Sequence, residues 1–359
     1  MFRYNNVCVR VAYYLKKRAN ILVTGVGGIV GQGIIKCLNM ANADEGSSVW
    51  YGIIGANASP FAAGLYMVKK GVIIPKADDD EYIPSLINII KRNKVTAVYV
   101  GTDPELVIIS KNKKFIEEET SAKVLVNPLN VIDIARDKWK TFRFLEENGF
   151  PCAESAIPEY LPSFLDRHKF PLVVKPREAY GSLQFHVVND RLELDYAISN
   201  IEKCGWRPII QEYLAGEDNE YTTGVLIDTK HSRVISSVSI QKYLKFGQTY
   251  KALIDDFIEI RKLSEKISLT LGARGAVNIQ SKLSDGINKV FEINPRFSAT
   301  CPMRAVAGIN EPDLHYRNAV LGQEIKLNSY KKLVCMRYWN EVYVEKQKYE
   351  EIVRTGIIT

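Results

Sequence analysis

The side chains that could do chemistry gather in the second half of the sequence, around Glu292. Glu292 and Asn294 stand two residues apart in a short apolar segment, so a strand would place both on one face. Gln280 lies on a preceding apolar segment and, across a turn at Asp285-Gly286, could come level with Glu292 in a hairpin. One carboxylate and two amide oxygens suit Mg²⁺, which leaves its remaining positions to water and phosphate.

Arg296 continues this face and could hold a phosphoryl group during its transfer, or stabilise a developing oxyanion. The same alternation predicts that Phe291 and Ile293 face the core. Glu292 could instead be a surface acid beside a plain turn. We favour a site, because a Glu and an Arg flanking a buried strand would otherwise carry a desolvation cost without a function.

A lysine at the end of an apolar strand is a second candidate. Lys175 ends the segment 171–175 and precedes a loop at Tyr180-Gly181-Ser182, an arrangement suited to clamping phosphate. A snorkelling edge lysine is an equally good interpretation of Lys175 alone.

Further on, the strand that ends at Gln211 runs into Glu212, Tyr213 and Leu214, where free backbone groups could pair with a purine edge. Glu220 could accept from ribose hydroxyls. A plain hinge remains the alternative for this crossing.

A glycine-rich turn follows the first predicted strand. Residues 25–33 begin where a dinucleotide-binding loop would open its helix. A strict Gly-x-Gly-x-x-Gly motif would need glycine where Val30 stands, and the second strand ends at Asn57 without the acid that binds a ribose diol. We interpret the loop as a structural turn, with dinucleotide binding left open.

These side chains need two kinds of sheet to position them. Apolar runs alternate with helical patterns from residue 21 to Pro128, which predicts a parallel, doubly wound sheet. Residues 129–149 have helical spacing, and closely spaced strands follow, which indicates antiparallel sheet. The fold class is therefore α/β and α+β, with limits at 1–20, 21–128, 129–213 and 214–359.

Composition excludes several classes. The 359 residues carry a net charge of +7, but the basic residues are scattered, so we expect no nucleic acid partner. The six cysteines form no Cys-x-x-Cys pair, which argues against zinc and disulfides. No stretch of about 18 apolar residues occurs, so we expect no membrane span and a cytoplasmic protein. Residues 1–20 lack the features of a signal peptide.

The ordered motifs resemble the ATP-grasp superfamily, and within it the synthetase half of the carbamoyl phosphate synthase large subunit. The motifs that carry the resemblance are Asp137-Lys138, Phe170-Pro-x-x-x-Lys175-Pro176, Gln211-Glu-Tyr-Leu-x-Gly216, Glu220, Gln280 and Glu292-x-Asn294-Pro-Arg296. The resemblance implies an ATP-grasp fold: a Rossmann-like pre-ATP-grasp domain at 21–128, a small lid at 129–213 and a large subdomain with a C-terminal extension at 214–359.

The resemblance also implies a role for each matched residue. Phosphates of ATP would be bound by Lys138 and Lys175 under a loop of Tyr180, Gly181 and Ser182, adenine by Glu212, Tyr213 and Leu214, ribose by Glu220, magnesium by Gln280, Glu292 and Asn294, and the acyl phosphate by Arg296. Lys175 and Arg296 would be catalytic. The first domain would contact substrate through Gly27, Gly28, Asp103 and Glu105.

The implied activity is that of an ATP-dependent carboxylate–amine ligase, which forms an amide through an acyl phosphate. ATP and Mg²⁺, with Mn²⁺ as a substitute, would be the cofactors, and small carboxylates and amines the partners; a homodimer is left open. The lid loop has one glycine where relatives are glycine-rich, and the chain has one synthetase half, so we do not expect it to make carbamoyl phosphate. An NAD(P)-binding oxidoreductase or epimerase and a catalytically silent nucleotide-binding module remain the alternatives.

Overall fold

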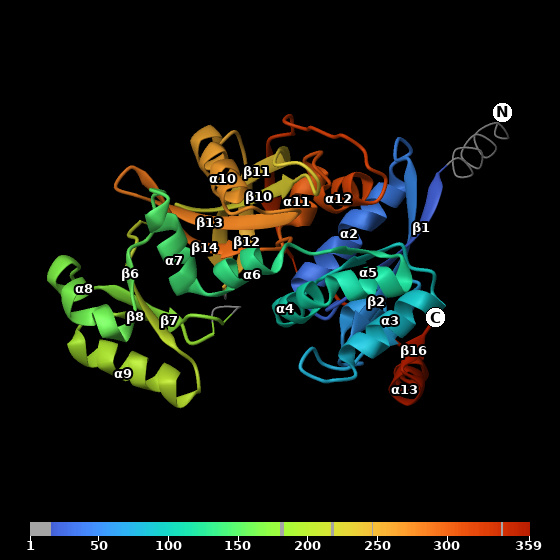
Figure 1. The fold of residues 1–359 in the computed structure, drawn as a ribbon, viewed down its shortest axis with the longest axis horizontal. Helices are drawn as coiled ribbons and strands as arrows, with labels where there is room; N and C mark the ends of the chain where they lie inside the picture. Colours follow the sequence, from blue (N-terminus) through green and yellow to red (C-terminus); the bar gives the residue numbers. More distant parts are fainter. Residues whose placement is uncertain (1–15, 180–182, 217–218, 246, 339) are drawn as a thin grey trace.

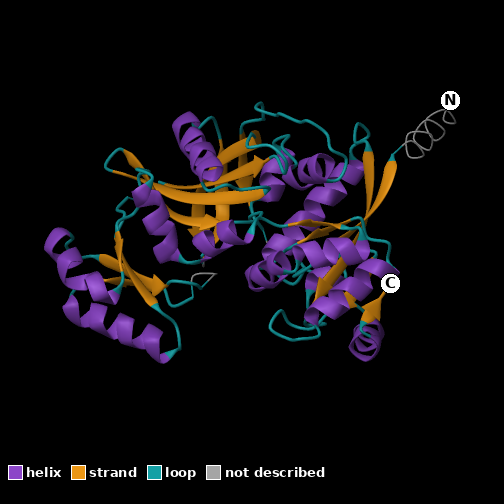
Figure 2. Ribbon diagram, viewed as in Figure 1, coloured by secondary structure: helices purple, strands orange, loops and turns teal. Residues whose placement is uncertain are grey.

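The computed structural model describes residues 16–359 except 180–182, 217–218, 246 and 339. A parallel sheet, a large antiparallel sheet and a small antiparallel sheet lie in succession along the molecule, with the small one at the end far from the C-terminus (Figures 1 and 2). The predicted combination of parallel and antiparallel sheets is therefore confirmed.

The first sheet has the order β16-β3-β2-β1-β4-β5, and all its pairs are parallel except that of β16 with β3. Helix α2 covers one face, and α3, α4 and α5 cover the other, as a doubly wound sheet requires. The elements are β1 (Lys17–Val23), α2 (Ile29–Ala43), β2 (Val49–Asn57), η1 (Ala63–Leu65), β3 (Lys70–Ile73), α3 (Tyr82–Arg92), β4 (Ala97–Tyr99), α4 (Asp103–Lys111), α5 (Lys113–Thr120), β5 (Lys123–Leu125) and β16 (Ile357–Ile358).

The large sheet has the order β14-β13-β10-β11-β12-β15 and is antiparallel throughout. Helices α6, α7 and α10 pack on its apolar face, which leaves the other face of β10, β13 and β14 for polar side chains. The elements are α6 (Leu129–Arg136), α7 (Lys138–Glu147), β10 (Glu220–Ile227), β11 (Val234–Lys245), β12 (Gln248–Ile254), α10 (Ile258–Thr270), β13 (Ala276–Ser284), β14 (Ile287–Asn294), α11 (Cys301–Val306), α12 (Glu311–Ala319) and β15 (Leu333–Met336). Helix α13 (Lys346–Thr355) follows and packs beside β16 of the first sheet (Figure 1).

The small sheet has the order β6-β9-β7-β8 and packs its apolar face against two helices. Lys175 and Gln211 lie on its neighbouring strands β7 and β9. The elements are β6 (Ser155–Ala156), η2 (Pro158–Tyr160), α8 (Leu161–Arg167), β7 (Leu172–Pro176), β8 (His186–Val188), α9 (Arg191–Lys203) and β9 (Pro208–Glu212).

The helical segment predicted at 129–149 is two helices, with the break at Asp137. The carboxylate of Asp137 caps α7 by accepting from the backbone N–H of Trp139 (2.9 Å), and an Asp at this position favours a new helix start over continuation. Both helices pack against β14 of the large sheet. The segment predicted as the lid, 129–213, therefore supplies helices to the large sheet and strands to the small one.

The parallel sheet and the large sheet share one apolar core. Side chains of α2 meet those of α11 and α12, and the same cluster continues to β11 and β12. The C-terminal strand β16 returns to the edge of the first sheet beside β3. Within the part of the chain that the structure describes, no helix is long and apolar enough to cross a membrane.

Candidate active site

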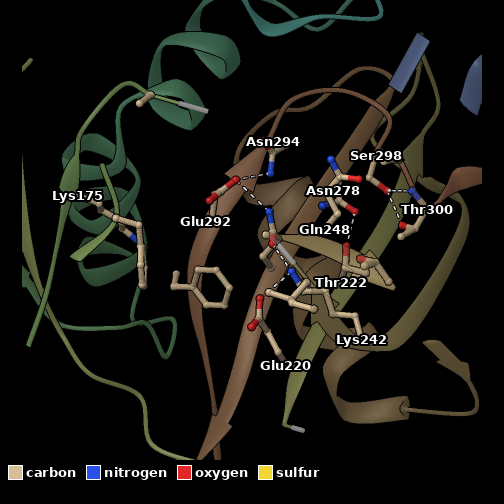
Figure 3. Close-up of a pocket in the computed structure, with 18 of the residues that line it drawn as sticks. Lys175, Glu220, Thr222, Lys242, Gln248, Asn278, Glu292, Asn294, Ser298 and Thr300 are labelled. Atoms are coloured by element: carbon tan, nitrogen blue, oxygen red, sulfur yellow. Dashed lines mark hydrogen bonds and ion pairs between the residues drawn. The ribbon is translucent and has the colours of Figure 1, made fainter. Parts of the chain in front are cut away.

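A cleft of about 840 Å³ lies between the polar face of the large sheet, the small sheet and the first domain. Its volume is that of a site for a small molecule such as a nucleotide. Figure 3 shows side chains of β7, β10, β11, β13 and β14 turned into this space. Most of the cluster predicted around Glu292 lies on its walls.

The pairing of β13 with β14 brings Gln280 opposite Glu292 and Asn278 opposite Asn294. The Gln280 amide donates to Glu292 Oε1 (3.0 Å), and the Asn294 amide donates to the same oxygen (2.9 Å). The hairpin prediction from the sequence is thus confirmed for these positions. One carboxylate and two amides converge on one point of the cleft.

The prediction that Phe291 faces the core is wrong. A β-bulge lies here, because Gln280 pairs with Glu292 while the next residue, Ser281, pairs with Val290. The extra residue turns the Phe291 ring into the cleft, whereas Ile293 is buried as predicted. The Phe291 ring centroid lies 5.5 Å from the Lys175 ammonium, within the range of a cation–π contact.

Two lysines approach the cleft from the small sheet and from α7. Lys175 is only 8% exposed and donates to Gln211 Oε1 (2.9 Å). Burial, with help from the neighbouring Lys138 charge, lowers the pKa of Lys175 to about 8. Lys138, the first residue of α7, donates to the backbone carbonyl of Ala179 (2.8 Å) at the start of the predicted loop.

The charge state of Glu292 follows from its neighbours. Burial would raise the pKa of its carboxyl group, but Lys138 and Lys175 oppose this, and the pKa lies below its ordinary value. Glu292 is therefore an anion at neutral pH. The two amide groups now point their nitrogens at Glu292, and rotating each terminal amide by half a turn would present its oxygen instead. One ionised carboxylate and two amide oxygens fit the oxygen ligands that Mg²⁺ prefers.

Sequence reasoning missed Lys242 of β11. Lys242 is 6% exposed, forms an ion pair with Glu220 (2.7 Å) and donates to Gln280 Oε1 (2.5 Å). The sequence did contain a signal for it. Val238, Ile240 and Lys242 alternate along the strand and so share one face, and the first two are buried. Glu220, predicted to bind ribose, thus lies on the cleft wall with one oxygen paired.

Arg296 and Asp103 form a bidentate ion pair between the large sheet and the first domain. The Arg296 guanidinium donates to the two Asp103 oxygens at 2.8 and 2.6 Å, and it also reaches Asn294 Oδ1 (3.2 Å). Burial would lower the pKa of Arg296, but the Asp103 charge raises it above its ordinary value. Asp103, predicted as a substrate contact, therefore holds Arg296 in place at the cleft.

The predicted adenine segment lines the cleft where β9 ends. The Glu212 carboxylate is already engaged, since Lys289 contacts both of its oxygens (2.8 Å each) and the backbone N–H of Glu154 donates to it (2.8 Å). Tyr213 and Leu214 follow as cleft-lining residues. The Glu212 carboxylate is therefore occupied. A purine bound here would pair with backbone groups of this segment instead. Tyr180, Gly181 and Ser182 lie outside the described residues.

The first-domain loop contributes less than predicted. Gly28, at the start of α2, lines the cleft, but Gly27 does not and donates its N–H to Asn57 Oδ1 (2.9 Å). Glu105 is also absent from the cleft wall: its carboxyl group is buried in the first domain, where the Thr24 hydroxyl donates to it. A Cβ on Gly31 would lie 2.6 Å from the Gly25 carbonyl, so close packing alone accounts for that glycine.

Comparison with known families matches both parts of the chain. Residues 135–300 match the model of the ATP-grasp domain, and residues 21–124 match the PylC-like N-terminal domain. The first match spans Lys138, Lys175, Glu220, Gln280 and Glu292. It ends with residues 296–300, which follow β14, mostly line the cleft and are called the cleft loop below.

Individual proteins agree with these matches. The carbamoyl phosphate synthase large chain of Clostridium beijerinckii is 26% identical over 326 residues, which cover 85% of this chain and 29% of that relative. N5-carboxyaminoimidazole synthetase from Staphylococcus aureus, solved with ADP, has a TM-score of 0.70 and 18% identity, covering 90% of this chain and 83% of that one. An L-amino acid ligase from Bacillus licheniformis has a TM-score of 0.61 and 18% identity, with 85% and 75% covered.

Proposed function

We propose that this chain, which carries an ATP-grasp domain behind a PylC-like N-terminal domain, is an ATP-dependent ligase that joins a carboxylate to an amine. The observation that carries the proposal is the ionised Glu292 with Gln280 and Asn294, facing Lys175 across one cleft. An acid, two amides and a buried cation suit the metal-bound phosphates of a nucleotide. The products would be an amide, ADP and phosphate.

Each group on the cleft wall has a task in this reaction. Lys138 and Lys175 would neutralise the phosphates, and Glu292, Gln280 and Asn294 would hold Mg²⁺. A metal bound there would supply positive charge that offsets the negative charge of the phosphates. Arg296 would stabilise the oxyanion that forms when the amine attacks the acyl phosphate, and its pair with Asp103 aims it in advance.

The nucleotide would lie along the hinge after β9. Adenine would pair with backbone groups of residues 212–214, and the ribose hydroxyls would donate to Glu220, which Lys242 holds in place at 2.7 Å. The apolar Phe291, turned inward by the bulge, gives this end of the cleft a flat surface. ATP with Mg²⁺, or Mn²⁺ in its place, is the cofactor that this arrangement supports.

The substrates are small molecules under this proposal. The chain spans 29% of the length of the Clostridium relative, and we do not propose that it makes carbamoyl phosphate. The L-amino acid ligase among its structural neighbours makes amino acids suitable first acids to test. We keep a homodimer and a cytoplasmic location as expectations.

The test is ADP release from the full chain with MgATP, screened over amino acids and small acids paired with amines. Glu292→Gln and Lys175→Ala should each lower acceptor-dependent ADP release by about 100-fold or more. Glu259→Gln, a change to an exposed acid outside the cleft, is the matched control and should leave ADP release unchanged.

Two results would count against the proposal. Full turnover in Glu292→Gln would remove the metal-site assignment. ATP binding without acceptor-dependent ADP release across the whole panel would instead identify a silent nucleotide-binding module. Mass spectrometry of the product distinguishes amide formation from simple ATP hydrolysis.

A further inference from the structure

We propose that Arg337 is a second anion-binding residue of the cleft and holds a free carboxylate of a substrate, one that is not itself phosphorylated. The inference rests on the ligase function proposed above and adds a substrate class to it. Arg337 follows β15 in the C-terminal segment, beyond the residues that match the ATP-grasp model.

Arg337 is held in place by backbone groups. Its guanidinium donates to the carbonyl of Thr249 (3.0 Å) on β12 and to the carbonyl of Ala299. A guanidinium has five N–H donors, so these two bonds orient it and leave others for a ligand. Thr249, Ala299 and Arg337 all line the cleft, so the oriented group borders the space where substrates would lie.

Arg337 differs in its pairing from two other cations of the cleft wall, Arg296 and Lys242. Arg296 is neutralised by Asp103 (2.6 Å), and Lys242 by Glu220 (2.7 Å). Among the described residues, by contrast, no carboxylate forms an ion pair with Arg337. Arg337 is partly buried, and this burial lowers its pKa from the ordinary value. A half-buried cation without a counter-ion is costly, and an anionic ligand would remove that cost.

The position of Arg337 separates it from the phosphate-binding lysines. It bonds to Ala299, between Ser298 and Thr300, and Figure 3 shows these two residues on the opposite side of the labelled cluster from Lys175. The cleft therefore has one cationic end for phosphates and another for a different anion. The N-terminus of α2 at Gly28, which no side chain caps, lines the same cleft and adds a favourable dipole for an anion.

The chemistry of the group indicates the ligand class. A planar guanidinium matches the two oxygens of a carboxylate, and it discriminates against an ester or amide of the same acid. A substrate with a carboxylate for Arg337 and a separate reacting group is an amino acid or a dicarboxylic acid. Ile29 and Val30 of α2 add apolar surface to the same cleft.

The experiment measures binding, so it does not depend on turnover. The full chain, saturated with MgADP, is titrated with each proteinogenic amino acid and with succinate, each beside its methyl ester, by calorimetry and thermal shift. Arg337→Ala and Arg337→Lys are compared with wild type. Arg274→Ala is the matched control, because Arg274 also donates to a backbone carbonyl (3.2 Å) and to Ser232 but lies outside the cleft.

We expect at least one acid to bind wild type and its methyl ester to bind about 10- to 100-fold more weakly. Arg337→Ala should lose a similar factor for the acid and none for MgADP, Arg337→Lys should lose less, and Arg274→Ala should match wild type. The inference is overturned if no acid in the panel binds, if Arg337→Ala binds the acid as wild type does, or if MgADP affinity falls in parallel. Acid binding without any ADP release would overturn the ligase proposal and leave this inference standing.

Discussion

At the scale of single residues, burial affects two opposite charges of the cleft unequally. Lys175 and Glu292 are both removed from water, yet the carboxyl group keeps its charge while the pKa of the ammonium group falls to about 8. The difference arises because Glu292 faces several cations, whereas Lys175 lies near a second cation, Lys138. Without bound phosphate, Lys175 therefore loses its proton near pH 8.

This predicts a pH dependence of ATP binding. Phosphate favours the charged lysine and would raise its pKa, so a proton should be taken up on binding once the pH exceeds about 8. Affinity for MgATP should then fall by up to about tenfold for each further pH unit. Calorimetry at about pH 7 and pH 9, in buffers of different ionisation enthalpy, measures both effects.

Lys175→Arg provides the control for this prediction, since its guanidinium stays charged over the whole range. The variant should show no proton uptake, and its affinity should be flat with pH. Equal proton uptake in wild type and variant would assign the titration to another group.

At the scale of elements, periodicity within a segment could be predicted, and contacts between distant segments could not. The strands, the doubly wound sheet and the level placement of Gln280 and Glu292 all follow from local alternation and a turn. The bulge at Phe291 was not predicted, because it depends on the pairing with the partner strand. The role of Lys242 was not predicted, because its partners Glu220 and Gln280 lie on other strands of the sheet. Arg337 lies in a segment with no motif at all.

The backbone of β10 gives an element-scale prediction at Gly224. A Cβ there would lie 2.3 Å from Glu311 Oε1 and 2.5 Å from Arg304 Cζ. This buried ion pair (2.8 Å) also supports the cleft loop, because Arg304 donates to Ser298 (3.1 Å) and Thr300 (2.8 Å). Gly224→Ala should therefore lower the free energy of unfolding by about 3 kcal/mol, measured by urea denaturation.

Gly46→Ala serves as the matched control, since the nearest atom to its Cβ would be 3.4 Å away, at Asp44 Oδ1. Its free energy of unfolding should stay within about 0.5 kcal/mol of wild type. Equal stability of the two variants would mean that α11 and α12 shift away from β10 at little cost.

At the scale of the whole molecule, the first domain and the large sheet behave as one packed body. They share an apolar core, the Asp103–Arg296 pair joins them at the cleft, and β16 returns the end of the chain to β3. The small sheet is attached differently, through polar contacts that include the ion pair of Arg177 with Asp137 (2.5 Å) at the start of α7 and that of Glu212 with Lys289 (2.8 Å) on β14. The nucleotide and the acid would therefore bind between this packed body and the small sheet, which has an apolar core of its own.

Folding shifts the pKa values of two buried groups in this packed body in opposite directions. Burial lowers the pKa of His315, which packs against Tyr99 and Phe297 between the first domain and the large sheet, from 6.5 to about 3. Burial raises the pKa of Glu105 from 4.5 to about 7, although the hydrogen bond from Thr24 opposes this. Both groups are therefore neutral in the folded protein over a range where the unfolded chain would charge them.

The last prediction concerns pH and global stability. As pH falls below 6.5 the unfolded chain gains a proton at His315 that the fold does not, so this group makes acid destabilising. As pH rises from 4.5 to 7 the unfolded chain loses a proton at Glu105 that the fold keeps, so this group makes base destabilising. Between 4.5 and 6.5 the two slopes, each about 1.4 kcal/mol per pH unit, cancel. Glu105→Gln should leave stability rising with pH in that window, and His315→Phe should leave it falling, as urea denaturation at several pH values would measure; slopes unchanged from wild type in both variants would contradict the assignment.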